Sequence, residues 1–161
     1  MKIIEYEKKY LEDVRDLLTE LEEYIVSIDK DGLDQVHPEY HEKMALIDLE
    51  EVRNYNGKCY LAIEDDKAIG LIMGTIIEFD KYDYLDYKCP KEGEITELIV
   101  TSKVRSSGVG KELMKQMENY FISQECEYVL VDIFAYNENA IGFYERRGYH
   151  NRMHTGIKKL K

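Results

Sequence analysis

The chain has 161 residues, of which 44% are hydrophobic and only two are prolines, and this predicts a single folded domain over residues 1–161 with a sizeable core. Its formal net charge at pH 7 is −11, from 33 acidic and 22 basic residues, which argues against general nucleic-acid binding because a phosphate backbone attracts a basic surface. The same balance is compatible with a cationic substrate such as an amine.

The cysteines, the histidines and the distribution of apolar residues argue against a disulfide-linked, metal-binding, secreted or membrane protein. The three cysteines, Cys59, Cys89 and Cys126, are odd in number and lack the spacing of a zinc site, so reduced thiols in a cytoplasmic protein are expected. The four histidines form no ligand set on one predicted element, and no metal is expected. Because the N-terminal segment is charged, no signal peptide is expected, and because no long apolar run occurs, no membrane span is expected.

The first part of the chain predicts a strand followed by two helices. A short strand is expected at 3–6, and apolar residues every three to four positions predict an amphipathic helix over about 8–27. A second helix is expected to begin near Pro38, since proline suits the first turn of a helix, and to end before Gly57.

A hairpin and an acidic loop come next. Strands are expected at 59–63 and 68–79, and Gly70 and Gly74 inside the second strand indicate a bulge or a close approach by another group. The loop 80–93 is rich in acidic residues and tyrosine. It is either a solvated connection or dimer contact, or a set of carboxylates and rings that faces a cation.

The most informative stretch is a strand, a glycine turn and a helix. Residues 95–100 predict a strand, and the apolar positions from Val109 to Phe121 predict a long amphipathic helix. Between them, Gly108 and Gly110 allow backbone N–H groups to approach a ligand at the positive end of the helix. The turn therefore predicts either an anion-binding seat or an ordinary connection in which glycine only relieves geometry.

Two common phosphate-binding motifs do not fit this turn. A P-loop would need glycine at the position of Arg105 and Ser or Thr at the position of Glu112. A dinucleotide fingerprint beginning at Gly108 would need a third glycine where Leu113 stands.

The end of the chain predicts a strand at 128–134, a short helix capped by Asn137 or Asn139, and a final strand near 152–160. Gly148 is expected to close the helix. The whole pattern predicts an α/β fold, an α+β mixed sheet with helices on both faces.

Two motifs together resemble the GNAT superfamily of acetyl-CoA-dependent N-acetyltransferases. The first is Arg105-Ser106-Ser107-Gly108-Val109-Gly110, and the second combines Asn137, Ala140, Tyr144, Gly148 and Tyr149. The resemblance spans about 60–149 and implies a GNAT-like fold, with a mostly antiparallel central sheet that splays after the fourth strand.

The resemblance also implies how acetyl-CoA would be held. The turn would bind its pyrophosphate, the backbone of the preceding strand would pair with its pantetheine arm, and the second motif would contact the cofactor near its sulfur. The expected cofactor-binding residues are Leu98, Ile99, Val100, Arg105, Ser106, Ser107, Gly108, Val109, Gly110, Lys111, Asn137, Asn139 and Tyr144.

Amine acetylation needs a proton acceptor for the amine and a proton donor for the departing thiolate. Tyr144 is the expected donor. Two carboxylates in otherwise apolar strands are candidate bases: Glu97, expected on the face that carries Ile95 and Ile99, and Asp132 in the next strand. A base acting through water is a further alternative.

The expected reaction is direct transfer of an acetyl group, in a ternary complex, to a primary amine of a small cationic molecule. No serine or cysteine shows an arrangement for covalent catalysis. The alternatives are acetylation of a protein N-terminus or lysine, and an acyl-CoA sensor without turnover. The resemblance also suggests a homodimer.

Overall fold

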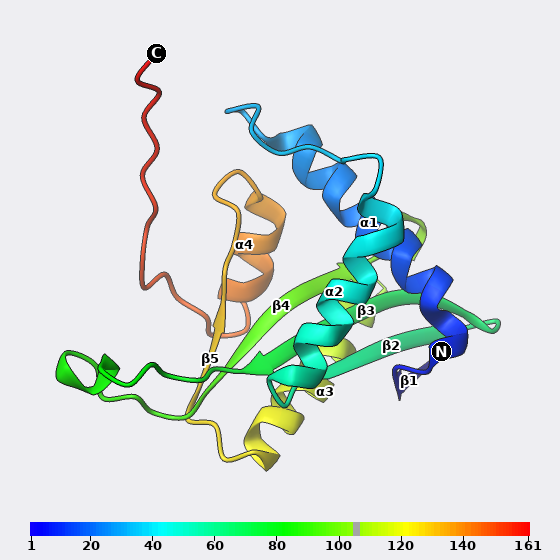
Figure 1. The fold of residues 1–161 in the computed structure, drawn as a ribbon. Helices are drawn as coiled ribbons and strands as arrows, with labels where there is room; N and C mark the ends of the chain where they lie inside the picture. Colours follow the sequence, from blue (N-terminus) through cyan, green and yellow to red (C-terminus); the bar gives the residue numbers. More distant parts are fainter. Residues whose placement is uncertain (105–106) are drawn as a thin grey trace.

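A five-stranded sheet in the order β1-β2-β3-β4-β5 organises the chain. The computed structural model describes residues 1–104 and 107–161. The strands are β1 (Lys2–Glu5), β2 (Lys58–Glu64), β3 (Lys67–Ile76), β4 (Glu92–Val100) and β5 (Tyr128–Val131). The first four pair antiparallel in sequence order, and β5 lies parallel to β4, so the predicted mixed sheet is confirmed (Figure 1).

Helices cover both faces of the sheet, as predicted (Figure 1). Helices α1 (Leu11–Ile28) and α2 (Tyr40–Asn54) pack on one face, and α3 (Val109–Ser123) packs on the other. The short helix α4 (Glu138–Glu145) follows β5, and single 3-10 turns lie at Lys8–Tyr10, Asp83–Leu85 and Ser102–Val104.

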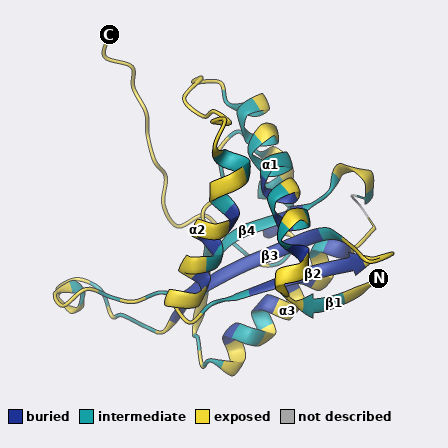
Figure 2. Cartoon of the chain, turned by 45° about the vertical axis from the view of Figure 1, so that its right-hand side comes forward, coloured by how far each residue is buried: buried dark blue, intermediate teal, exposed yellow. Residues whose placement is uncertain are grey.

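The core has two layers because strand side chains alternate between the faces. Leu71 and Met73 of β3 join the α1–α2 layer, whereas Ile72 between them joins the α3 layer. Figure 2 shows the buried strands β2 and β3 between helices whose outer sides are exposed. In α3 the buried residues recur at helical spacing, as predicted from the apolar pattern: Val109, Leu113, Met114, Met117 and Phe121.

A β-bulge interrupts β4. Met73 pairs with Glu97 and Gly74 with Ile95, so Thr96 has no partner on β3. The extra residue reverses the alternation: Ile95 packs in the α3 layer and Ile99 in the α1–α2 layer. The expectation that Glu97 shares one face with both isoleucines was therefore wrong, since the bulge separates them.

The sheet splays at this bulge. Strand β5 pairs with β4 only from Glu92 to Ile95, and β4 then continues alone on that side to Val100. The predicted splay after the fourth strand is confirmed (Figure 1). The expected extension of β5 to Phe134 was wrong because β5 loses its pairing partner after Val131.

The predicted final strand at 152–160 was also wrong. Residues 150–161 contain no regular secondary structure and run away from the sheet (Figure 1). Met153 and Leu160 are 83% and 85% exposed. A strand needs a neighbour to satisfy its backbone hydrogen bonds, and no described strand pairs with this segment.

Candidate active site

The predicted strand and the predicted helix are present as β4 and α3, and the N-terminus of α3 is not capped by a described side chain. Gly108 takes a left-handed φ of 88° as the N-cap of α3, and no described side chain caps it. A Cβ at Gly108 would have no atom within 4 Å. The first N–H groups of the helix lack intrahelical partners, so this end is suited to an anion.

The residues that flank Gly108 and Gly110 differ in their hydrogen bonding and exposure. The Ser107 hydroxyl donates a hydrogen bond to the Val104 carbonyl at 2.6 Å, Val109 is buried and Lys111 is exposed. Arg105 and Ser106, also expected to bind the cofactor, lie outside the described residues.

The two sequence motifs meet at Gly110. A Cβ at this position would lie 3.3 Å from the ring of Phe143, so the start of α3 packs closely against α4. This contact brings the N-terminus of α3 close to Phe143, and Tyr144 is the next residue of α4.

The second half of β4 forms a sheet edge on the side away from β3. Ile99 is buried, and Leu98 and Val100 pack against the α3 layer. Within residues 1–104 and 107–161, no strand pairs with this half of β4 on its outer side. An extended ligand such as a pantetheine arm can add to such an edge as a further strand does.

Asn137 and Asn139 are tied to helix α1. Asn137 is the N-cap of α4: its Oδ1 accepts from the Ala140 N–H at 3.1 Å and from the Tyr24 hydroxyl at 3.3 Å. Asn139 Nδ2 donates to the same hydroxyl at 3.4 Å. The structure thus gives Asn137 a helix-capping role, and contact of either residue with a cofactor stays a prediction.

Tyr144 is buried in an aromatic group at the end of α4. It is 6% exposed, and its ring makes edge contacts with Phe143 at 5.3 Å and Tyr149 at 5.4 Å between centroids. The pKa of Tyr144 is raised to about 12, first by burial and then by the negative charge of Glu97, while the positive charge of Arg147 acts in the opposite direction. The phenol is therefore protonated at neutral pH and able to donate.

Glu97 has the ionisation behaviour of a base near neutrality. Burial, followed by the charges of Asp48, Glu22 and Glu51, raises the pKa of Glu97 to about 8. The negative charge of Glu97 is one of the causes that raise the pKa of Tyr144, so the two predicted catalytic residues lie within electrostatic range of each other.

Asp132 occupies a different position from the one predicted. It is exposed beyond the end of β5, and its charge acts on Glu94, whose pKa is raised by burial first and then by Asp132 and Glu51. No charge effect of Asp132 on Glu97 or Tyr144 appears among the described groups. The preference for Glu97 over Asp132 as the base stays a prediction.

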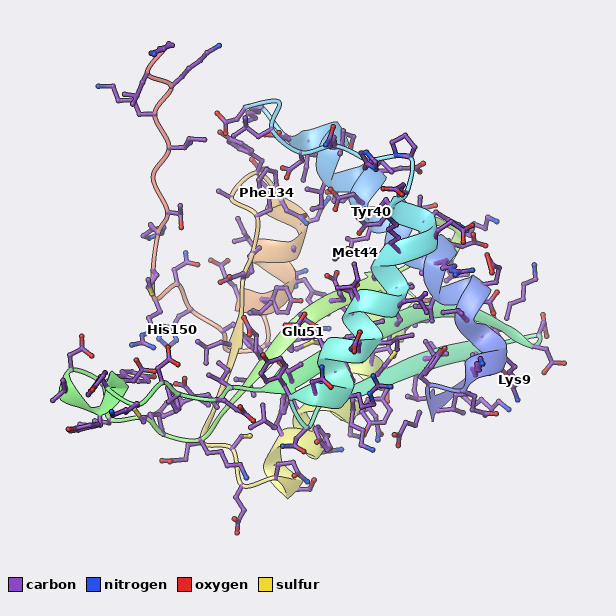
Figure 3. All side chains as sticks on the ribbon, viewed as in Figure 1. Lys9, Tyr40, Met44, Glu51, Phe134 and His150 are labelled. Atoms are coloured by element: carbon purple, nitrogen blue, oxygen red, sulfur yellow. The ribbon has the colours of Figure 1, made fainter. Side chains whose placement is uncertain are left out.

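Sequence reasoning missed Asp48 and its surroundings. Asp48 lies on the buried stripe of α2 between Ala45 and Val52, and burial with the charge of Glu51 raises its pKa to about 6. An acidic residue on the apolar stripe of a helix was the signal that could have identified it. Figure 3 shows Tyr40, Met44 and Glu51 along the same helix.

Replacing Glu97 by Gln should stabilise the protein at high pH. The folded carboxyl has a pKa of about 8 against an ordinary 4.5, so the folded state keeps a proton that the unfolded chain releases, and stability falls as the pH rises from 4.5 to 8. Allowing for partial exposure, the cost of ionisation is on the order of 3 kcal/mol, or roughly 6–12 °C in Tm. Thermal unfolding at pH 5 and pH 9 measures it.

The gain from Glu97→Gln should be nearly complete at pH 9 and small at pH 5. Glu50→Gln on the exposed side of α2 is the matched control and should change Tm little at either pH. Equal Tm gains at both pH values would show that relief of ionisation is not the cause.

The described residues contain no group of three or more His, Cys, Asp or Glu side chains arranged to hold a metal ion. Nor is any helix in the described part of the chain long and apolar enough to span a membrane.

Comparisons with known proteins agree with this fold. The family model described as Acetyltransferase (GNAT) family matches residues 11–149. An uncharacterised N-acetyltransferase of Methanocaldococcus jannaschii is 31% identical over 94 residues, which cover 58% of this chain and 53% of that protein. Human N-alpha-acetyltransferase 30 is 26% identical over 98 residues, covering 61% of this chain and 25% of that protein. The alignments thus span about half and a quarter of these two relatives.

Solved structures show the same fold at low sequence identity. A mutant protein of Bacillus halodurans has a TM-score of 0.80 at 17% identity, over 100% of both chains. AAC(6')-Iy, in complex with the bisubstrate analog CoA-S-monomethyl-acetylneamine, has a TM-score of 0.68 at 18% identity, over 99% of this chain and 97% of that one. With the family match over most of its length, the chain belongs to the GNAT family of acetyltransferases.

Proposed function

We propose that this protein transfers an acetyl group from acetyl-CoA to a primary amine of a small cationic molecule, by direct transfer in a ternary complex. The observation that carries the proposal is that Glu97, just after the bulge where β4 parts from β5, lies within electrostatic range of the buried Tyr144 phenol. A proton acceptor and a proton donor then lie beside an open backbone edge.

The cofactor would lie across the open edge and the start of α3. The pyrophosphate would accept hydrogen bonds from the backbone N–H groups that follow Gly108, where Lys111 adds positive charge. The pantetheine arm would run along Leu98, Ile99 and Val100 toward Tyr144. The relative named for a CoA-containing bisubstrate analog supports this placement through its shared fold.

The chemistry follows from the two side chains. Ionised Glu97 removes a proton from the ammonium group, and the free amine attacks the thioester carbonyl carbon to form the C–N bond. Backbone N–H groups of β4 polarise the carbonyl oxygen. The C–S bond then breaks, and the sulfur leaves with its electron pair and takes the Tyr144 proton. The nitrogen of the new C–N bond gives its second proton to the Tyr144 phenolate, and Glu97 releases its proton to solvent, so both side chains return to their starting states.

Acetyl-CoA should raise the melting temperature of the protein, and free thiol should appear when a suitable amine is added. The panel includes simple monoamines, polyamines, aminoglycosides, amino acids and peptides, read out by thiol release. Because ionised Glu97 is the base, kcat/KM should rise with pH through about 8, and Glu97→Gln should lose this rise. A protein that acetyl-CoA does not stabilise would refute the cofactor assignment.

A second candidate is acetylation of a protein N-terminus or lysine. One relative is named N-alpha-acetyltransferase 30, and this favours including N-terminal peptides in the panel. Tight cofactor binding with no turnover on any amine would instead support the acyl-CoA sensor. The homodimer and the cytoplasmic location stay predictions.

A further inference from the structure

Carboxylates from four parts of the chain form two linked sets along β4, one at Glu97 and one at Glu94. The charges of Asp48, Glu22 and Glu51 act on Glu97, and those of Asp132 and Glu51 act on Glu94. Glu51 therefore links two sets of acidic groups. We name this group the carboxylate cluster; it comprises Glu22 of α1, Asp48 and Glu51 of α2, Glu94 and Glu97 of β4, and Asp132 after β5.

The carboxylate cluster has no counterion in the described part of the chain. No ion pair between described residues includes any of its members, although exposed pairs such as Lys43 with Glu39 and Arg53 with Glu50 lie elsewhere on α2. The charges that raise the pKa of Glu97, Glu94 and Asp48 are all negative. Like charges held together in this way favour a cation from outside the protein.

Asp48 gives the strongest indication of a missing cation. It is only 7% exposed, and its Oδ2 has no hydrogen-bond partner among the described residues. It is one of the buried residues of α2, the charge of Glu51 raises its pKa, and its own charge raises the pKa of Glu97. A buried carboxylate without a partner is unfavourable unless a positive charge lies nearby.

The bulge at Thr96 sets two acidic positions on one face. Residues three apart in a regular strand point to opposite faces, but the extra residue lets both Glu94 and Glu97 interact with the charge of Glu51 on α2. At about 3.4 Å per residue, their Cα atoms are separated by roughly 10 Å. The acidic positions are thus spread along the strand rather than gathered around one point.

This spread argues for an organic cation rather than a metal ion. No three described His, Cys, Asp or Glu side chains converge closely enough to hold a metal. One ammonium group at Glu97 would also leave Glu94, Glu51 and Asp132 without a counterion. A molecule with two separated positive charges matches the two separated acidic positions along β4 better than a single ion does.

We infer that the acceptor carries at least two ammonium groups, as a diamine or polyamine does, with the reacting amine at Glu97 and a second ammonium against Glu94, Glu51 and Asp132. This inference rests on the proposed acetyl transfer and narrows its substrate class. Asp48 acts as a positioning residue whose buried charge holds the cation between the two positions.

The test compares amines of matched length that differ in charge. Acetyl transfer to butylamine, 1,4-diaminobutane, 1,5-diaminopentane and spermidine is followed by thiol release at saturating acetyl-CoA. We expect kcat/KM for the best diamine or polyamine to exceed that for butylamine at least tenfold. Glu51→Gln should lower kcat/KM for that amine about tenfold more than for butylamine, mainly through KM.

Glu50→Gln is the matched control, because Glu50 neighbours Glu51 on α2 but pairs with Arg53. Glu50→Gln should leave kcat/KM for both amines unchanged, which separates a local effect of Glu51 from a general loss of negative charge. Since Glu51 is exposed, its replacement should not prevent folding.

The outcomes separate this inference from the proposed function. Failure of acetyl-CoA to bind, or no transfer to any amine, would overturn the proposed function itself. Transfer with equal kcat/KM for butylamine and the diamines, or equal effects of Glu51→Gln on both, would overturn the inference while leaving acetyl transfer in place. Faster transfer to peptides than to any polyamine would also overturn it.

Discussion

Gly108→Glu should abolish acetyl-CoA binding, weakening its Kd at least 100-fold and removing the rise in melting temperature. The substitution places a carboxylate where the open N-terminus of α3 would receive a pyrophosphate, so attraction becomes repulsion. It also forces a residue with a Cβ into a φ of 88°, which costs on the order of 1 kcal/mol. Calorimetric titration with acetyl-CoA measures the effect.

Gly32→Glu controls for the backbone strain and the added charge. Gly32 also has a positive φ, 68°, and open space around the position of a Cβ, but it lies in the connection after α1. This variant should bind acetyl-CoA like the wild type. Cofactor binding by Gly108→Glu at wild-type strength would rule out the α3 N-terminus as the phosphate site.

Tyr144→Phe should lower kcat by a factor of roughly 10² to 10⁴ while leaving KM for acetyl-CoA nearly unchanged. The phenol, with a pKa of about 12, holds its proton until the thiolate leaves, and phenylalanine has no proton to give. Phenylalanine keeps the ring that packs against Phe143 and Tyr149, so the substitution should leave the fold and its Tm intact. Thiol release under saturating substrates gives kcat.

Tyr149→Phe is the matched control for the aromatic group. Its ring touches that of Tyr144, but its hydroxyl donates to Glu118 on α3 at 3.2 Å. This variant should keep most of the turnover. Full activity in Tyr144→Phe would show that the thiolate takes its proton from another source.

The sequence predicted well those elements whose local pattern determines them. The apolar spacing from Val109 to Phe121 allows only one buried face, and Gly108 sits where the chain turns with positive φ. The motif around Tyr144 was likewise placed on its helix, since Asn137 caps it. Local patterning and these two motifs therefore predicted the fold and the elements that carry the candidate site, whereas the roles of the site residues stay predictions.

The remaining features depend on partners distant in sequence. Thr96 is unremarkable within a strand, so nothing local predicts a bulge there, although Gly74 opposite Ile95 did indicate an irregularity. The bulge determines where β5 stops, and hence why Asp132 lies outside the strand. Asp48 becomes significant only once α2 is packed over the sheet beside Glu97.

Helix α1 joins the two halves of the candidate site. Its Glu20 accepts hydrogen bonds from Thr101 and Ser102 at the end of β4, and its Tyr24 binds the cap of α4 through Asn137. Between them lies Glu22 of the carboxylate cluster.

Residues 20 to 24 span little more than one turn of a stiff helix, so they move together. A shift of α1 relative to the end of β4 is therefore also a shift of Glu22 in the carboxylate cluster. By thermodynamic reciprocity, whatever factor the cofactor adds to the affinity for the amine, the amine adds to the affinity for the cofactor. On the proposed placement of the two substrates, this one helical turn is the element through which their affinities are coupled.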